Sequence, residues 1–354
     1  MKKNFLITTG GSGGHVIPAT IFYDHLSKEA NITLTIDKRG LKYLDKKVFD
    51  FKIIDTPRFG NIFLLPLNTI LVLFLILKSL FLLKKKKIEK IFSTGGYMSL
   101  PIILAAKLLR LKVYLIEPNQ VLGRANKYFL NSCTKIFCYS KEIINFPQKY
   151  KDKMMMIYPL VKESIYKLKS HNDTKDTFSL LIVGGSQGAN IFDKNLKNFI
   201  VNISKKKSIR VIQQTDEKNI SNLRDFYLNS NVKNDIFNFD NNFVDLLQEA
   251  DLCITRAGAS TLAELSVSNI PFIAVPLPTS KDNHQFENAY FYKKNNCCWI
   301  IEQSQFEEKI EEVLKDIFDN KKDYLQKKAN LKKINYQNSW INVNQKILSV
   351  INEN

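Results

Sequence analysis

Short apolar runs alternate with stretches of helical periodicity along nearly the whole chain. In the first half the apolar runs occupy residues 4–8, 32–36, 88–93, 113–117 and 135–139. Helical patterns begin near Ile17 and Ser99, each shortly after such a run. Strands that alternate with helices form parallel sheets with helices on both faces, so this half predicts one doubly wound α/β domain.

The alternation stops in a polar stretch at residues 167–177 and then restarts. The new apolar runs are at 178–183, 209–213, 232–239, 252–255 and 271–275, and helical patterns continue to the end of the chain. We therefore predict two doubly wound, Rossmann-like domains joined by a linker. Ligands of such sheets bind at the carboxyl ends of the strands, so turns from both domains are expected to line a cleft.

Four glycine-rich turns lie at predicted strand ends: GGSGGH from Gly10, GGYMSLP from Gly95, GGSQGA from Gly184 and TRAGASTLAEL from Thr255. Glycine lets the backbone approach a ligand closely, and a helix N-terminus offers unpaired N–H groups with a partial positive charge. GGSGGH and GGSQGA match neither the GxGxxG pattern of nicotinamide enzymes nor a P-loop. The turns therefore indicate binding of phosphate or sugar groups in another kind of enzyme.

The 354-residue chain is strongly basic, with 52 Lys and Arg against 34 Asp and Glu and a net charge of +18. This imbalance favours an anionic partner. The lysines are spread along the chain without an aromatic and arginine-rich recognition pattern, so we expect no nucleic-acid partner. Five cysteines without metal-ligand spacing predict a reducing compartment and no structural zinc.

Residues 62–83 form the most apolar segment of the chain, and four lysines follow it directly. A proline, an asparagine and a lysine interrupt it, which leaves three interpretations: a full membrane span, a buried helix, or an interfacial patch edged by lysines. We favour the patch, because each basic residue beside an anionic lipid surface adds roughly 1 kcal/mol. The patch would run from Ile70 to Leu83, with its basic edge from Lys84 to Lys87.

Two residues are candidates for a general base. His15 closes the first glycine turn at the start of a helix, where the helix dipole should favour its neutral, proton-accepting form. Glu117 ends a predicted strand, where doubly wound folds place functional groups. The sequence does not separate these two candidates.

The fourth turn suits a nucleotide sugar. It opens a helix, and Glu264 in the first turns of that helix can accept hydrogen bonds from vicinal ribose hydroxyls. The chain has no Asp-x-Asp pair of the kind that holds a divalent cation. We therefore expect backbone N–H groups and side-chain donors, without a metal ion, to meet the charge of a diphosphate.

Taken together, six motifs resemble the MurG family, the N-acetylglucosaminyltransferases that complete lipid II. They are the four turns, the segment EPNQxxGRAN from Glu117 to Asn126, and VPLPTSKDNHQFENA from Val275. The resemblance implies a metal-independent GT-B glycosyltransferase at the cytoplasmic face of the bacterial inner membrane. UDP-GlcNAc would bind mainly to a domain at 163–337, and lipid I to a domain at 1–162 that the tail from about residue 338 rejoins.

The resemblance also implies roles for individual residues. The expected substrate-binding residues are Ser12, Gly13, Gly14, Asn119, Ser186, Asp240, Ala259, Ser260, Thr261, Leu262, Ala263, Glu264 and Gln285. Ser186 would lie by the diphosphate, Asp240 would contact uracil through its backbone, and Gln285 would bind GlcNAc hydroxyls.

The chain departs from the family pattern at two places. Ile116 stands where the family commonly has a histidine before the glutamate, so a partner for Glu117 is missing from the motif. An arginine expected near Val161 is also absent, and what replaces it stays open. Other interpretations are a lipid glycosyltransferase, a UDP-GlcNAc 2-epimerase, or a non-enzymatic protein that binds membrane or nucleic acid.

Overall fold

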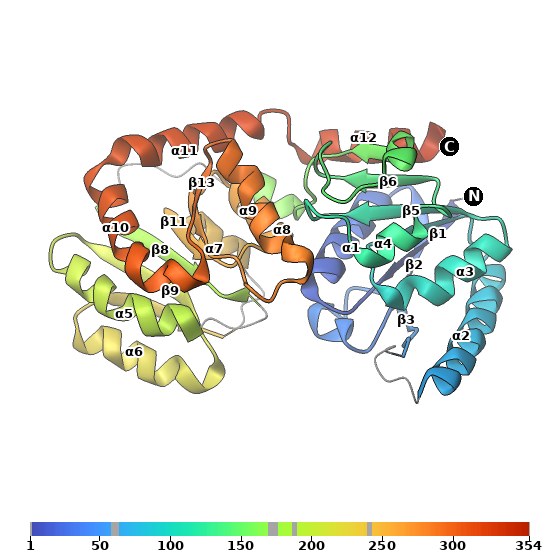
Figure 1. Cartoon of the computed structure of the whole chain (residues 1–354), viewed down its shortest axis with the longest axis horizontal. Helices are drawn as coiled ribbons and strands as arrows, with labels where there is room; N and C mark the ends of the chain where they lie inside the picture. The colour runs from blue at the N-terminus through green and yellow to red at the C-terminus, as the bar shows by residue number, and fades with distance from the viewer. Residues whose placement is uncertain (1, 58–63, 169–175, 186–189, 239–242, 354) are drawn as a thin grey trace. The chain divides into compact units, whose positions relative to one another are not determined.

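The structure is a computed structural model that describes residues 2–57, 64–168, 176–185, 190–238 and 243–353. Contacts divide the chain into two compact units, Met1–Leu160 with Ile341–Asn354, and Val161–Trp340 (Figure 1). We call them the N-terminal and the C-terminal unit and describe each by itself.

A seven-stranded parallel sheet forms the centre of the N-terminal unit. Its strands lie in the order β3-β2-β1-β4-β5-β6-β7. They are β1 (Lys3–Thr9), β2 (Ala30–Ile36), β3 (Phe51–Ile53), β4 (Lys90–Ser93), β5 (Lys112–Glu117), β6 (Lys135–Cys138) and β7 (Met154–Met156). The order reverses between β1 and β4, which is the switch point where doubly wound sheets bind ligands.

Helices cover both faces of this sheet. On one face α1 (Gly13–Leu26) packs Phe22 against Phe92 and Phe137, and α12 (Trp340–Glu353) joins it through a hydrogen bond between His25 and Asn344. The other face has a separate aliphatic core. Its helices are α2 (Leu65–Lys85), α3 (Leu100–Leu108) and α4 (Arg124–Phe129).

The C-terminal unit repeats this plan with a six-stranded parallel sheet in the order β10-β9-β8-β11-β12-β13. Its strands are β8 (Phe178–Val183), β9 (Ile209–Gln214), β10 (Lys233–Phe237), β11 (Leu252–Thr255), β12 (Phe272–Ala274) and β13 (Cys298–Ile300). The helices are α5 (Asn190–Ser204), α6 (Ile220–Asn229), α7 (Phe243–Glu249), α8 (Ala259–Val267), α9 (His284–Lys294), α10 (Phe306–Asp319) and α11 (Lys321–Ile334).

Two hydrophobic clusters lie on opposite faces of the second sheet, because alternate residues of each strand point to opposite sides. Leu180 and Ile182 face α5, α6 and α10, whereas Leu181 and Val183 face α7, α8, α9 and α11. The prediction of two doubly wound parallel-sheet domains is confirmed. Here too the strand order reverses at a central pair, β8 and β11.

Some details of the prediction were wrong. The short strands β3, β7 and β13 were not predicted, and each is an edge strand of three residues, too short to show a periodicity. The first helix begins at Gly13 rather than near Ile17, so that Pro18 lies inside it. Most of the predicted linker at 167–177 lies outside the described residues.

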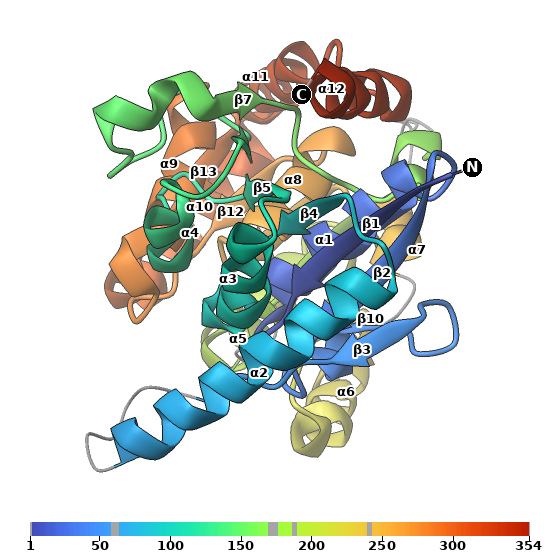
Figure 2. The ribbon, with the colours of Figure 1, turned by 90° about the vertical axis from the view of Figure 1, so that its right-hand side faces the viewer.

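Helix α2 is unusually exposed for so apolar a segment. Its buried side chains are Asn68, Val72, Ser79 and Leu83, which form one stripe. Only 17% of its most apolar window is buried, and in Figure 2 its N-terminal half extends past α3. Among the described residues it is the one helix long and apolar enough to cross a membrane. The exposure excludes the interpretation of α2 as an ordinary buried helix.

Candidate active site

The first glycine turn connects β1 to α1 at the switch point of the N-terminal sheet. Gly10 and Gly11 have φ of +152° and +80°, values that residues with a side chain rarely adopt. Ser12 is the N-cap in an extended conformation, and the N–H of Val16 donates to its carbonyl at 3.1 Å. Helix geometry therefore leaves the N–H groups of Gly13 and Gly14 without an acceptor inside the helix, which suits an anionic oxygen.

The second turn, from Gly95 to Ser99, follows the neighbouring strand β4 and lies against the first turn. A Cβ built on Gly96 would be 2.5 Å from the Met98 methyl and 3.9 Å from the His15 ring, and one built on Gly11 would be 3.1 Å from the same methyl. These contacts bring together two motifs more than 80 residues apart in the chain. The half-buried His15 ring lies where they meet.

Glu117 is enclosed by the loop that follows β5. The side chain is 2% exposed, and its carboxylate accepts hydrogen bonds from Asn119 N and Nδ2 (3.2 and 3.1 Å), Gly123 N (2.8 Å) and Asn126 Nδ2 (2.9 Å). Burial raises the pKa of Glu117, and these hydrogen bonds act in the opposite direction. The partner that the motif lacks at Ile116 is thus supplied by the loop itself.

This loop also touches the second turn, because a Cβ on Gly95 would be 3.0 Å from Asn126 Oδ1. The N-terminal unit therefore gathers Ser12, Gly13, Gly14, His15 and the loop of Glu117 and Asn119 at the carboxyl ends of β1, β4 and β5.

The third turn ends β8 at the switch point of the C-terminal sheet. Gly185 has φ of +67°, and its N–H donates to Gln214 Oε1 at 3.0 Å. The predicted contacts Ser186 and Asp240 lie outside the described residues, so their places in the site stay predictions.

The fourth turn leads from β11, the strand beside β8, into α8. Gly258 is the N-cap, and the first bond inside the helix runs from Leu262 N to Gly258 O at 3.0 Å. The N–H groups of Ala259, Ser260 and Thr261 precede this bond and have no acceptor within the helix. The side chains of Leu262 and Ala263 are buried in the core, so only their backbone belongs to this end of the helix.

Glu264 lies one turn further along α8 and is 8% exposed. Burial raises its pKa to about 7, and the positive charge of Lys162 lowers it. Lys162 is the residue next to Val161, where the family arginine was expected. The structure thus places an exposed cation close to Glu264.

Gln285 in α9 holds the fourth turn in place through hydrogen bonds. Its Oε1 accepts the N–H groups of Ala257 (3.2 Å) and Leu277 (3.0 Å), and Asn288 Nδ2 donates to Ala257 O at 3.2 Å. Both of these bonds to Gln285 use its amide oxygen. Its amide NH2 group can therefore donate a hydrogen bond to a ligand.

Sequence reasoning missed two groups of residues at these strand ends. Arg256 is 9% exposed in the fourth turn, and its described hydrogen bonds go to uncharged acceptors, Val275 O and Gln303 Oε1. In the N-terminal unit, Asp37 and Arg39 follow β2 and contact both glycine turns. The signal was available in both cases: a charged residue directly after an apolar run that forms a parallel strand.

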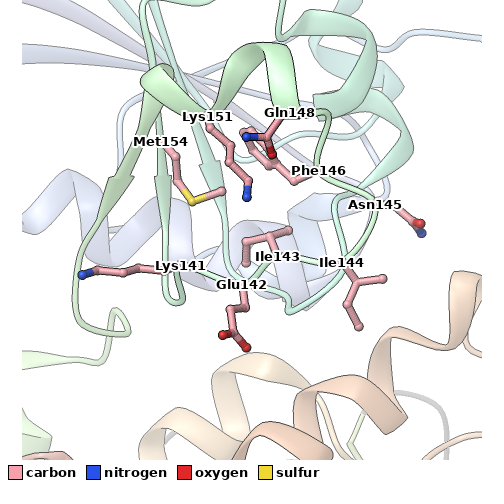
Figure 3. Close-up of a pocket in the computed structure, with 9 residues that line it drawn as sticks. All are labelled: Lys141, Glu142, Ile143, Ile144, Asn145, Phe146, Gln148, Lys151 and Met154. Carbon is pink, nitrogen blue, oxygen red and sulfur yellow. The ribbon is translucent and has the colours of Figure 1, made fainter.

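A shallow cavity of about 340 Å³ lies elsewhere on the N-terminal unit, and none of the predicted site residues lines it (Figure 3). It is formed by the segment after β6, which is hydrogen-bonded to the Glu117 loop through Ile144 and Gln120 (2.8 Å). Its lining residues are Lys141, Glu142, Ile143, Ile144, Asn145, Phe146, Gln148, Lys151 and Met154.

Comparison with known proteins agrees with this geometry. Residues 5–138 match the glycosyltransferase family 28 N-terminal domain, and residues 179–339 match the glycosyltransferase family 28 C-terminal domain. The structure resembles the crystal structure of Acinetobacter baumannii MurG, with a TM-score of 0.77, 22% identity and complete coverage of both chains. It also resembles a UDP-GlcNAc 2-epimerase from Neisseria meningitidis, with a TM-score of 0.69, 15% identity, and coverage of 99% of this chain and 100% of that one.

Two curated relatives share a single name: UDP-N-acetylglucosamine--N-acetylmuramyl-(pentapeptide) pyrophosphoryl-undecaprenol N-acetylglucosamine transferase. The protein of Pelagibacter ubique is 49% identical over 356 residues, with complete coverage of both chains. That of Rickettsia canadensis is 34% identical over 330 residues, covering 90% of this chain and 92% of its own. The chain belongs to the MurG family of glycosyltransferases, built from the two domains of glycosyltransferase family 28.

Proposed function

We propose that this enzyme transfers GlcNAc from UDP-GlcNAc to the 4-hydroxyl of MurNAc in lipid I, the undecaprenyl-diphosphate-linked MurNAc-pentapeptide. The products are lipid II and UDP, and the anomeric carbon is inverted. The observation that carries this proposal is the 49% identity to a transferase of that name over the complete length of both chains. The turns at both switch points support it, because they are the elements that would hold the substrates.

The donor is held by the C-terminal unit. The N–H groups of Ala259, Ser260 and Thr261 at the start of α8 meet the diphosphate, because a helix N-terminus attracts anions. Glu264 accepts hydrogen bonds from the ribose hydroxyls, and the amide nitrogen of Gln285 donates to GlcNAc. Arg256 lies two residues before the N-cap Gly258 and is buried, and its positive charge would offset part of the diphosphate charge without a metal ion.

His15 is the general base. A base must reach the acceptor hydroxyl. The half-buried His15 ring lies where the two glycine turns meet, at the carboxyl ends of β1 and β4. The oxygens of Glu117 are already engaged by four N–H donors and are enclosed. Glu117 therefore shapes the loop that presents Asn119.

The transfer is a single displacement. A ring nitrogen of His15 takes the proton of the MurNAc 4-hydroxyl as that oxygen forms a bond to the anomeric carbon of GlcNAc. The bond from this carbon to the diphosphate oxygen breaks, and UDP leaves with the electron pair. The N–H groups at the start of α8 stabilise the charge that develops on the leaving diphosphate.

The enzyme reaches its lipid-linked substrate as a peripheral protein on the cytoplasmic face of the cell membrane, through α2. Large apolar side chains cover the exposed face of this helix: Leu64, Leu65, Leu67, Ile70, Leu71, Leu73, Phe74, Leu77 and Phe81. Lys84–Lys87 lie in its last turn and directly after it, and all four are exposed. An apolar face edged by lysines is what an anionic bilayer surface binds.

The test is incubation of the purified protein with radiolabelled UDP-GlcNAc and lipid I in anionic vesicles. We expect label in lipid II and release of UDP, and neither without lipid I. Formation of UDP-ManNAc in the absence of acceptor would instead identify a 2-epimerase. A protein that turns over neither substrate and is not stabilised by UDP would contradict the proposal.

A further inference from the structure

Three residues connect the two glycine turns of the N-terminal unit. Asp37 follows β2, Arg39 lies two residues later, and Tyr97 is part of the second turn, 58 residues further along the chain. Asp37 is completely buried, whereas the Arg39 side chain is 29% exposed. Neither the glycine motifs nor the proposed mechanism accounts for this group.

Asp37 holds the first turn through its Oδ1 atom. This oxygen accepts the N–H of Gly11 at 2.8 Å and the N–H of Gly40 at 2.9 Å. A Cβ on Gly10 would lie 2.3 Å from the same atom, so the turn and the carboxylate fit each other only with glycine there. The conformation that exposes the N–H groups of Gly13 and Gly14 therefore depends on Asp37.

Arg39 joins this carboxylate to the second turn. Its Nε and Nη2 lie 2.6 and 2.5 Å from Asp37 Oδ2, and its Nη1 lies 2.5 Å from the Tyr97 hydroxyl. The guanidinium carbon also lies 4.9 Å from the centre of the Tyr97 ring. Because Asp37 neutralises Arg39 and occupies two of its nitrogens, this arginine acts as a connection between the turns and not as a free anion-binding group.

The direction of the bond to Tyr97 has a chemical consequence. Guanidinium groups only donate hydrogen bonds, so the Tyr97 oxygen must be the acceptor. Its own O–H proton points away from Arg39 and, within the part of the chain that the structure describes, has no acceptor. The neighbouring Gly96 lies beside the His15 ring, so the turn that carries Tyr97 adjoins the proposed base.

We propose that Arg39 is a positioning residue that orients the Tyr97 hydroxyl to donate a hydrogen bond to an oxygen of the lipid-linked acceptor. This inference rests on the proposed function for the identity of the acceptor. Through Asp37 the same arginine fixes the first glycine turn, so the spacing between the turns and the direction of the donor are set together.

Kinetics of four variants test the proposal: Arg39→Gln, Arg39→Lys, Tyr97→Phe and the double variant Arg39→Gln with Tyr97→Phe. A hydrogen bond to a charged group is strong enough that we expect kcat/KM for lipid I to fall about 10- to 100-fold in each glutamine or phenylalanine single variant. The kcat/KM of the double variant for lipid I should be no lower than that of the less active single variant, because both changes disrupt the same connected pair of residues. The KM for UDP-GlcNAc should stay within about twofold of the wild type.

Arg39→Lys and a matched control variant distinguish a positioning role of Arg39 from a general loss of folded structure. Arg39→Lys should recover part of the activity, because an ammonium group can pair with Asp37 but cannot also reach Tyr97 in the same geometry. Lys38→Gln is the control, since the Lys38 side chain is 72% exposed and its ion pair with Asp55 is long, at 3.7 Å. It should behave as the wild type with both substrates.

Two results would overturn the inference: wild-type kinetics in Arg39→Gln, or equal losses for both substrates together with a lower Tm. Hydrogen exchange of the Gly11 amide gives a readout that does not need activity. Arg39→Gln should speed that exchange, because Asp37 loses the partner that holds it, and unchanged exchange would refute the connection. If the wild-type protein does not act on lipid I, the proposed function fails, and this exchange measurement still decides on the connection.

Discussion

At the scale of single residues, the two candidate bases differ in what surrounds them. The Glu117 carboxylate faces four N–H donors inside its loop, whereas the His15 ring is half-buried where two glycine turns meet. His15→Ala should lower kcat about 100-fold or more and leave the Tm nearly unchanged, because a general base contributes 10²- to 10⁴-fold. Glycosyl transfer to lipid I and a thermal melt measure the two effects.

Glu117→Gln should show a different pattern. Whichever way the amide is oriented, its NH2 group would face two N–H donors, at a cost of about 1–3 kcal/mol per unsatisfied group. We therefore expect a clear drop in Tm, with a loss of activity that follows the loss of folded protein. A Glu117→Gln variant that melts like the wild type but has no turnover would restore Glu117 as the base.

Glu264 makes the stability of the C-terminal unit depend on pH. Its pKa is about 7 in the folded protein, above the ordinary value of 4.5, so the fold favours the neutral acid. Stability from this group is fully present below pH 4.5 and is lost as the pH rises towards 7. Each pKa unit corresponds to about 1.4 kcal/mol, so the shift from 4.5 to about 7 sets an upper limit of about 3 to 4 kcal/mol on the change.

Glu264→Gln should therefore flatten the loss of Tm between pH 5 and pH 8 in melts without ligand. Lys162→Gln is the matched change of opposite sign, because removing the nearby positive charge disfavours the ionised carboxylate and should steepen the loss. Melting curves at several pH values measure both effects. Equal slopes in the wild type and Glu264→Gln would assign the dependence to another group.

At the scale of elements, the sequence was most informative where strands are buried on both faces. The predicted runs at 178–183 and 252–255 coincide with β8 and β11, because central parallel strands are continuous apolar stretches bounded by turns. All four glycine turns follow the central strands β1, β4, β8 and β11, where the strand order reverses. Motif and topology therefore agree on the sheet edge at which each glycine turn lies.

Long-range contacts could not be predicted from the pattern. The four donors to Glu117 come from a loop whose closure depends on Gly123 and on Asn126 in α4. The link from Asp37 through Arg39 to Tyr97 joins residues that come together only because β2 and β4 both pair with β1 in the sheet. Edge strands of three residues are too short to show a hydrophobic periodicity, so β3, β7 and β13 could not be predicted from the sequence.

Helix α2 is the element whose exposed face predicts its partner. Leu67, Ile70, Phe74 and Leu77 are 54 to 64% exposed and lie on the side opposite its buried stripe. Changing all four to serine should weaken binding to vesicles at least about tenfold, even if each side chain is only partly buried in lipid. UDP affinity and Tm should not change. Vesicle sedimentation and UDP titration measure these outcomes.

The control uses apolar side chains of similar exposure in the C-terminal unit. Leu228 on α6 and Leu325 on α11 are 57% and 50% exposed, and changing both to serine should leave vesicle binding intact. Changing Lys84–Lys87 to glutamine should instead remove the preference for anionic over neutral vesicles. Equal vesicle binding by the wild type and the four-serine variant would show that α2 does not contact the bilayer.

At the scale of the whole molecule, the net charge of +18 and the proposed diphosphate site at the start of α8 both concern the binding of anions. In the proposed site, the N–H groups at the start of α8 and the buried Arg256 would supply fixed positive potential for the diphosphate. UDP binding should therefore raise the Tm equally with and without EDTA. At 100 times its Kd, a ligand of the folded state adds about 2.7 kcal/mol of stability, enough for a clear shift.

Arg256→Met tests this electrostatic argument, because methionine keeps much of the buried volume and removes the charge. The variant should lose most of the UDP-induced shift in Tm, whereas uridine, which has no phosphate, should bind the variant and the wild type alike. Calorimetric titration with the two ligands separates loss of the phosphate contact from damage to the nucleoside site. If EDTA abolishes UDP binding to the wild type, a divalent cation balances the diphosphate charge, and the N-terminus of α8 does not suffice for it.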